Sequence, residues 1–186
     1  MAWPRLGAMD VSIRRAEPQE LAAVGELTAE VYLADGLLAE GADDPYLSHL
    51  RDAAGRAAHA EVLVALDPAD PAAGPLGTVT FVGRGGKLAE VSGEGEAEFR
   101  MLAVRPEARG RGVGEALVRE CLRRARALGR KRVLLSSQLQ MHTAHRLYRR
   151  LGFVRAPERD WEPVPGLMLH AFAHEFAADP EPEHNI

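Results

Sequence analysis

The sequence of 186 residues predicts a mixed α/β fold. Short apolar or alternating runs are typical of strands, whereas apolar residues at steps of three and four are typical of amphipathic helices. Along the chain these patterns give the order strand, two helices, three strands, helix, strand, helix and two strands. The length suits one core, because single cores usually stop growing at about 250–300 residues. No internal repeat or linker divides the sequence, so we expect a single domain over residues 10–176.

The first half of the chain is expected to run from a strand through two helices into a hairpin with a long loop. Pro18 suits the start of the first helix because its ring fixes a helical φ angle, and Gly55 weakens the second helix. The glycine-rich segment 83–95 is predicted to be a loop. The expected bounds are 11–14 for the first strand, 18–33 and 46–60 for the helices, and 61–66 and 77–82 for the hairpin.

The second half is expected to alternate strands with helices. Gly129 and Gly152 follow the two helices and suit their C-terminal ends. Trp161 lies among three prolines, which predicts a rigid loop before the last strand. The expected strands are 97–104, 132–136, 153–155 and 167–176, and the expected helices are 113–128 and 142–151. Residues 1–9 are expected to form an N-terminal extension, and 177–186, rich in Pro and Glu, a disordered tail.

The net charge of −4 is the sum of two unequal halves. Residues 1–100 carry −9, residues 101–186 carry +5, and the segment 105–132 alone carries +7. An acidic chain is a poor general binder of nucleic acid, so no nucleic-acid partner is expected. A local excess of positive charge is nevertheless suited to a compact polyanion.

Cys121 is the only cysteine, which excludes a disulfide within the chain and is typical of a reducing compartment. A cytoplasmic protein is therefore expected. No apolar run approaches the roughly 20 residues of a membrane span, so no membrane partner is expected. His170 and His174 lie on a predicted strand, where four residues span about 13 Å. Because neither they nor His142 and His145 have supporting ligands, no metal is expected.

The segment from Met101 to Leu117, MLAVRPEARGRGVGEAL, carries the strongest functional signal. A predicted strand leads into a loop with glycines at 110, 112 and 114, and then into a helix. Glycines let the backbone approach a ligand closely, and the N–H groups of a helix start attract anions. Arginine side chains in the same loop add donors for phosphate oxygens. These features predict a pyrophosphate site. The loop is not a P-loop, because it lacks the Gly-Lys-Ser/Thr ending. It is not a dinucleotide-binding fingerprint either, because Glu115 stands where that pattern needs glycine.

Three sequence patterns together resemble the GNAT superfamily of acyl-CoA-dependent N-acetyltransferases. The first is Arg-x-x-Gly-x-Gly at Arg109, Gly112 and Gly114, and the second is the Leu-Ala-Val-Arg-Pro run before it. The third is the A-x-x-L-Y-x-x-L-G-F pattern from Ala144 to Phe153. The resemblance implies a GNAT-like fold with a central, mostly antiparallel, splayed sheet flanked by helices. It also implies that acetyl-CoA lies where strands 97–104 and 132–138 part.

The resemblance implies that a set of residues binds the acyl donor, acetyl-CoA, and that no metal is needed. The pantetheine arm is expected to pair with the backbone near Leu102 and Val104, and the pyrophosphate to bind in the glycine loop. Met141 stands where the family often has an asparagine that contacts the donor. The expected donor-binding residues are Leu102, Ala103, Val104, Arg109, Gly110, Arg111, Gly112, Val113, Gly114 and Ala144.

Two catalytic residues follow from the same resemblance. Tyr148 matches the tyrosine that protonates the departing CoA thiolate, and Glu98 matches the position of the base that deprotonates the amine, directly or through a water. Glu96 and Glu94 compete with Glu98 for this role. Only a neutral amine attacks a thioester, so a base is needed. The implied reaction is direct transfer of an acetyl group in a ternary complex with a primary amine.

Two alternatives remain open at this point. One is a GNAT-like domain that binds acyl-CoA without catalysis; the other is a module that binds nucleic acid or phosphoprotein through the Arg-rich segment 119–132. The acidic first half and the Glu94–Glu98 cluster suggest a cationic acceptor. A small-molecule amine, an antibiotic and a peptide N-terminus all remain candidates, and a homodimer through edge strands is possible within such a family.

Overall fold

The computed structural model describes residues 10–177, so the predicted extension at 1–9 and most of the predicted tail lie outside the described residues. The fold is mixed α/β, as predicted, and is built on one eight-stranded sheet. The strand order is β1-β2-β3-β4-β5-β8-β6, with β7 paired to β8. The strands are β1 Ser12–Arg15, β2 Glu61–Leu66, β3 Gly77–Val82, β4 Glu96–Val104, β5 Arg132–Gln138, β6 Val154–Arg155, β7 Trp161–Val164 and β8 Leu167–Glu175.

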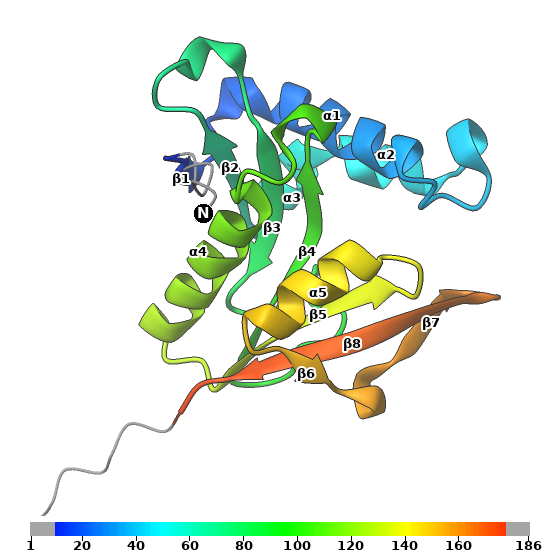
Figure 1. The fold of residues 1–186 in the computed structure, drawn as a ribbon. Coiled ribbons are helices and arrows are strands. Elements are labelled where there is room, and N and C mark those ends of the chain that lie inside the picture. Colours follow the sequence, from blue (N-terminus) through cyan, green and yellow to red (C-terminus); the bar gives the residue numbers. More distant parts are fainter. Residues whose placement is uncertain (1–9, 178–186) are drawn as a thin grey trace, which may run out of the picture.

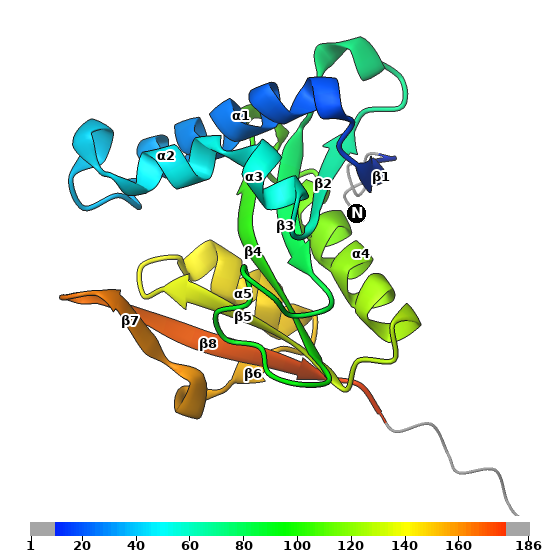
Figure 2. The same cartoon turned by 180° about the vertical axis from the view of Figure 1, so that it is seen from behind.

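Helices cover both faces of the sheet (Figures 1 and 2). One face carries α4 (Val113–Ala127) and α5 (His142–Arg150), whose buried side chains join β2–β5 in the largest apolar cluster. The other face carries α1 (Leu21–Ala34), α2 (Tyr46–Arg51) and α3 (Ala53–Ala57). On α4 the predicted apolar positions Val113, Leu117 and Cys121 are all buried, which confirms the helical spacing read from the sequence.

The sheet divides between β4 and β5. These two strands are parallel and pair over only three positions, Glu96–Glu98 with Arg132–Leu134. Beyond Glu98, β4 continues beside β3, and beyond Leu134, β5 continues beside β8. Figure 1 shows the two strands diverging from this short seam. The splay that the resemblance implied is therefore present.

Two sequence-based expectations about elements were wrong. The helix expected at 46–60 is broken at Asp52, whose side chain accepts a hydrogen bond from Gly55 N–H at 2.8 Å and starts α3. The buried guanidinium of Arg56 then donates to the carbonyls of His49 and Leu50 at the end of α2. The loop expected around Trp161 contains β7. Prolines are tolerated there because β7 pairs only with β8, as edge strands do.

Candidate active site

A cavity of about 350 Å³ lies where the sheet divides. Phe99–Leu102 of β4 and Leu135–Gln138 of β5 form its two strand walls. Residues of α1, α2 and their connecting loop close one side, and β7 with β8 close another. Gln138 Nε2 donates to Leu37 O at 2.8 Å, which joins the end of β5 to the α1–α2 loop. The lining as a whole is mainly apolar and aromatic, and includes Tyr32, Tyr46, Met141, Tyr148, Trp161 and Leu169.

A bulge in β4 shapes the wall of this cavity. The pairing of β3 with β4 shifts between Thr78 and Thr80, and Met101 takes a left-handed φ of 54°. A bulge leaves backbone groups outside the regular ladder and turns side chains to new directions. Of the residues predicted to contact the donor arm, Leu102 lines the cavity, whereas Ala103 is buried beside Leu27. Of Leu102, Ala103 and Val104, Leu102 alone therefore lines the cavity.

The predicted pyrophosphate loop directly precedes α4. Gly110 and Gly112 have φ angles of 72° and 85°, and a Cβ on either would meet open space. Only glycine adopts such angles at little cost, so the loop depends on both residues. The first helical bond runs from Ala116 N–H to Gly112 O at 2.9 Å. The N–H groups of Val113, Gly114 and Glu115 therefore lie at the positive end of the helix dipole.

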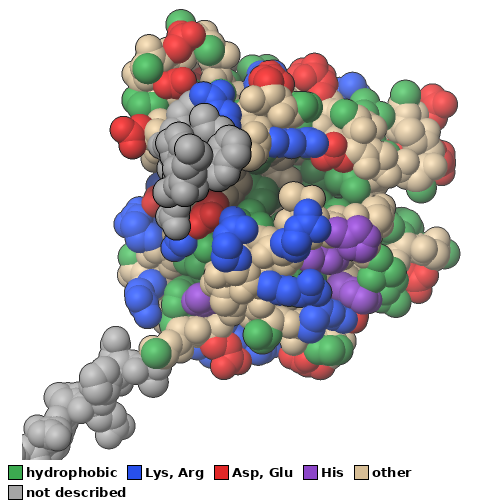
Figure 3. All heavy atoms as spheres, in the orientation of Figure 1, with side chains coloured by type: hydrophobic (Ala, Val, Ile, Leu, Met, Phe, Trp, Pro, Cys, Tyr) green, Lys and Arg blue, Asp and Glu red, His purple; other side chains and the backbone are tan. Residues whose placement is uncertain are grey.

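Several arginines of segment 105–132 lie on α4 or in the glycine loop before it. On α4, Arg119 pairs with Glu115, Arg123 with Glu120, and Arg124 with Glu120 and Glu61. In the glycine loop, Arg109 reaches Asp35 at the end of α1 at 2.9 Å, and Arg111 is exposed. Figure 3 shows Lys, Arg and His side chains gathered over the face that α4 and α5 cover. The net +7 already counts Glu115 and Glu120, so only pairs with acids outside the segment offset it further. These are Arg109 with Asp35, Arg124 with Glu61 and Arg132 with Glu96.

Tyr148 lies on α5 and lines the cavity with 4 % of its surface exposed. Its ring packs against Phe99, Phe153 and Phe172, at centroid distances of 5.9, 5.9 and 6.1 Å. Burial raises the pKa of the phenol, so the hydroxyl keeps its proton through the neutral range. Within residues 10–177 that hydroxyl makes no hydrogen bond. The side chain is thus held rigidly by its ring while its proton remains available.

The other predicted residues of α5 and its approach lie beside the cavity. Ala144 packs on the edge of the large apolar cluster, and Met141 lines the cavity. Ser137 Oγ lies 3.0 Å from His145 Nε2 and 3.4 Å from Met141 Sδ. Among residues 10–177 there is no group of three or more His, Cys, Asp or Glu side chains that could hold a metal ion.

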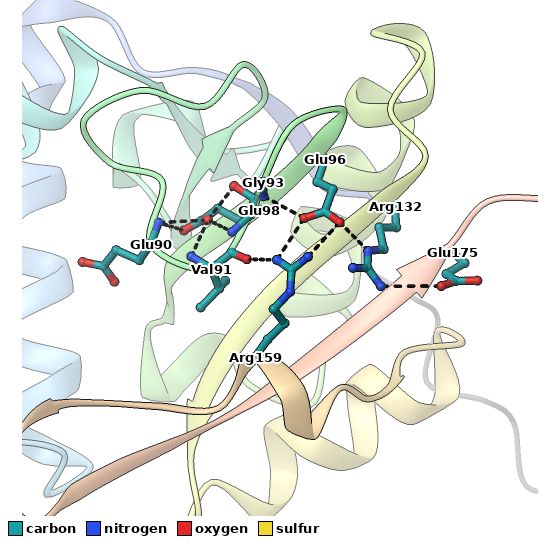
Figure 4. Close-up of polar contacts among 9 residues, drawn as sticks. Glu90, Val91, Gly93, Glu96, Glu98, Arg132, Arg159 and Glu175 are labelled. Atoms are coloured by element: carbon teal, nitrogen blue, oxygen red, sulfur yellow. Dashed lines mark hydrogen bonds and ion pairs between the residues drawn. The ribbon is translucent and has the colours of Figure 1, made fainter.

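Glu98 is the third residue of β4, and its carboxylate does not line the cavity. The side chain is 2 % exposed, and both oxygens accept from Glu90 N–H at 3.1 Å. Oε2 also accepts from Val91 N–H at 3.0 Å and from the N–H and hydroxyl of Ser92 at 2.7 Å each. Four of these five contacts fall on Oε2, whereas Oε1 accepts only the hydrogen bond that it shares with Oε2 from Glu90 N–H. The catalytic role of Glu98 stays a prediction, while the structure shows that Glu98 binds the 90–92 loop (Figure 4).

Glu96 anchors the same loop from its other end. Its carboxylate accepts from Gly93 N–H at 2.7 Å, from Arg132 at 2.6 Å and from Arg159 at 3.1 Å. Burial alone would raise the pKa of Glu96, but these hydrogen bonds outweigh it and hold the pKa below its ordinary value of 4.5. Arg159 also donates to Val91 O, which ties the C-terminal part of the chain to the loop. Glu94 is exposed, so the three predicted glutamates occupy three different environments.

The cavity contains charged residues that the sequence did not single out. Glu90 and Arg100 both line it and form an ion pair at 2.9 Å. Arg100 also donates to Leu88 O at 3.2 Å and lies 3.4 Å from the hydroxyl of Tyr46. Arg100 follows Glu98 by two residues on a strand, so the period of two could have indicated it. Glu90 lies in an irregular loop, where no periodic signal exists.

Comparisons with known proteins agree with this geometry. The Acetyltransferase (GNAT) family matches residues 28–153. No curated protein is significantly similar in sequence. Solved structures match over nearly their whole length. A GCN5-related N-acetyltransferase from Kribbella flavida is 24% identical, with 89% of this chain and 98% of that chain covered and a TM-score of 0.64.

Two further structures are described with acetyl-CoA or with coenzyme A. The yncA protein from Salmonella typhimurium, with its cofactor acetyl-CoA, is 20% identical, with 94% of this chain and 98% of that chain covered and a TM-score of 0.64. PaiA N-acetyltransferase from Thermoplasma acidophilum, in complex with coenzyme A, is 16% identical, with 90% and 100% covered and a TM-score of 0.68. At these identities the likeness shows the fold. Within residues 10–177 no helix has the length and apolar character needed to cross a membrane.

Proposed function

Because the chain belongs to the GNAT acetyltransferase family, we propose that it transfers an acetyl group from acetyl-CoA to a primary amine. One observation carries the proposal. The division of β4 from β5 opens an apolar cavity lined by a buried tyrosine, and the chain after β4 continues into a glycine loop at the start of α4. A thioester, an amine and a pyrophosphate each have a matching environment in this arrangement.

The donor is proposed to bind along the divide. Its pantetheine arm would hydrogen-bond to the backbone of Leu102, Ala103 and Val104, which lies beyond the β4–β5 pairing. Its pyrophosphate would accept from N–H groups of the loop Arg109–Gly114, where the helix dipole favours negative charge. Ala144 on α5 would border the arm. The open space in front of Gly110 and Gly112 supports this placement.

The transfer is proposed to run in a ternary complex. A neutral amine attacks the thioester carbonyl carbon, the C–N bond forms and the C–S bond breaks. Tyr148 gives its proton to the departing thiolate, and its oxygen recovers a proton from the nitrogen of the forming amide. The raised pKa of Tyr148 supports this role, since the phenol is protonated before transfer. Backbone N–H groups at the bulge would stabilise the negative charge that develops on the carbonyl oxygen.

The acceptor is proposed to be a small or slender amine. A cavity of about 350 Å³ suits one small molecule or one chain end, and most of its lining is apolar. The buried Glu96 and Glu98 do not line it, so the acidic cluster at 94–98 is weak support for a cationic acceptor. The homodimer remains a proposal from the sequence, and light scattering on the purified protein tests it.

The proposed function is tested by measuring acetyl-CoA binding and by measuring turnover. Acetyl-CoA at 100 times its Kd should raise the free energy of unfolding by about 2.7 kcal/mol, which a thermal shift detects. Turnover is measured as release of the CoA thiol in the presence of each member of a panel of primary amines. At least one of these amines should act as an acceptor. No stabilisation by either acetyl-CoA or CoA would overturn the proposed function. Stabilisation with no turnover on the panel would favour the runner-up, a domain that binds acyl-CoA without catalysis.

A further inference from the structure

The cavity holds two carboxylates among the described residues, Asp44 and Glu90. Asp44 is engaged by the backbone, because it accepts from Tyr46 N–H at 2.9 Å and from Glu40 N–H at 3.3 Å. Glu90 is different: Oε1 pairs with Arg100 at 2.9 Å, and within residues 10–177 no other group is hydrogen-bonded to its carboxylate. The side chain of Glu90 is 34 % exposed. Of the two, Glu90 is the carboxylate with an oxygen available to a ligand.

The backbone beneath Glu90 is fixed. Its own N–H binds both oxygens of Glu98, and the following residue, Val91, is held by Glu98 through its N–H and by Arg159 through its carbonyl. Figure 4 shows the side chain of Glu90 pointing away from this network, while its main-chain nitrogen points into it. Glu98 and Arg159 thus hold the segment from which the Glu90 carboxylate extends to the cavity.

We propose that Glu90 takes the proton from the acceptor ammonium and that Glu98 is the positioning residue that holds Glu90 in place. The inference rests on the proposed function. In the step, the N–H bond of the ammonium breaks, the proton moves to Oε2 of Glu90, and the neutral amine keeps the electron pair that attacks the thioester. After transfer, Glu90 releases this proton to water.

The surroundings of Glu90 suit a base. Burial raises the pKa of its carboxyl, Arg100 partly offsets this, and Glu98 adds a small further rise. Across the cavity, Asp44, Tyr46 and His49 face the site from the α2 side. A general base works best when its pKa lies nearer the operating pH. Arg100 keeps the Glu90 carboxylate oriented and leaves Oε2 for the amine.

The experiment compares Glu90→Gln with Glu30→Gln, the same change at an exposed position of α1 that does not line the cavity. Activity is kcat/KM for the best amine of the panel, measured from pH 6 to pH 10. At pH 7 we expect kcat/KM of Glu90→Gln to fall about 10²-fold or more, and kcat/KM of Glu30→Gln to match the wild type. The loss should shrink as the pH approaches the pKa of the amine, because the amine is then already neutral. A merely structural defect would give a loss that does not depend on pH.

The outcomes separate this inference from the proposed function. A loss below about threefold, a loss constant with pH, or loss of acetyl-CoA stabilisation in Glu90→Gln would overturn the role of Glu90. A pH-dependent loss found in Glu98→Gln but not in Glu90→Gln would assign the base to Glu98. If Glu90→Gln does not fold, Glu90→Asp replaces it, with partial activity and a wild-type pH profile expected. Absence of turnover by the wild type on every amine would overturn the proposed function, and this inference with it.

Discussion

Replacing Glu98 by glutamine tests the structural role of the buried carboxylate. Glutamine keeps the shape of the side chain but has one acceptor oxygen and no charge. If that oxygen replaces Oε2, it keeps Val91 and both donors of Ser92, whereas the new NH₂ group faces Glu90 N–H at 3.1 Å. Hydrogen bonds to a charged group contribute about 1.5–3 kcal/mol and neutral ones about 0.5–1.5 kcal/mol. Allowing for the easier burial of the neutral amide, we expect a loss of about 2 kcal/mol in the free energy of unfolding.

Urea unfolding at 25 °C, followed by circular dichroism, measures this loss. With an unchanged m value, the midpoint should shift to lower urea. The melting temperature should fall by about 4–8 °C, since 1 kcal/mol corresponds to about 2–4 °C in a protein of this size. Glu94→Gln, at an exposed position, should stay within about 0.5 kcal/mol of the wild type. The reasoning is refuted if Glu98→Gln is as stable as wild type or if Glu94→Gln loses as much.

Three further predictions address the donor site, the acid and the pH dependence of stability. Gly112→Ala should weaken acetyl-CoA binding at least tenfold by calorimetry, whereas Gly86→Ala, with a similarly positive φ of 93° in another loop, should bind normally; equal weakening in both would argue against the phosphate site. Tyr148→Phe should lower kcat about 10²-fold while the Kd for acetyl-CoA is unchanged, and wild-type turnover in this variant would exclude the acid role. The folded-state pKa of Glu96 is depressed, so its stabilisation is present above about pH 4.5 and is lost as the pH falls through the folded-state pKa. Thermal melts from pH 7 to pH 3 should therefore fall less steeply below pH 4.5 for Glu96→Gln than for the wild type, and parallel curves would contradict the assignment.

The elements that could be predicted from the sequence are those with a local signal. Strands 61–66 and 77–82 match β2 and β3 to the residue, because each is a short apolar run between turn residues. The α4 helix followed from its apolar spacing, and Gly129 and Gly152 do take left-handed φ angles after their helices. The break at Asp52 was not predictable from spacing, since it depends on a side chain that caps a new helix and on Arg56 from the helix beyond.

The residues of the candidate site also fall into those that a local sequence pattern indicates and those that it does not. The glycine loop and Tyr148 lie in contiguous patterns, so a single stretch of sequence indicates them. The environment of Glu98 depends on the 90–92 loop folding back over β4, which no periodicity encodes. Glu90 reaches the cavity for the same reason. Residues positioned by long-range closure of an irregular loop are therefore found only once the fold is known.

The pairing of β4 with β5 over only three residues leaves backbone N–H and C=O groups of both strands unpaired with each other. Beyond the seam, two strands present unpaired edges to each other inside the molecule, between α5, the α1–α2 loop and β7. At a sheet rim, such edges invite pairing with other chains and aggregation. Here the edges line a cavity of about 350 Å³ inside the fold and do not lie on its outer rim. The fold thus keeps the pairing capacity of an edge strand without its usual hazard.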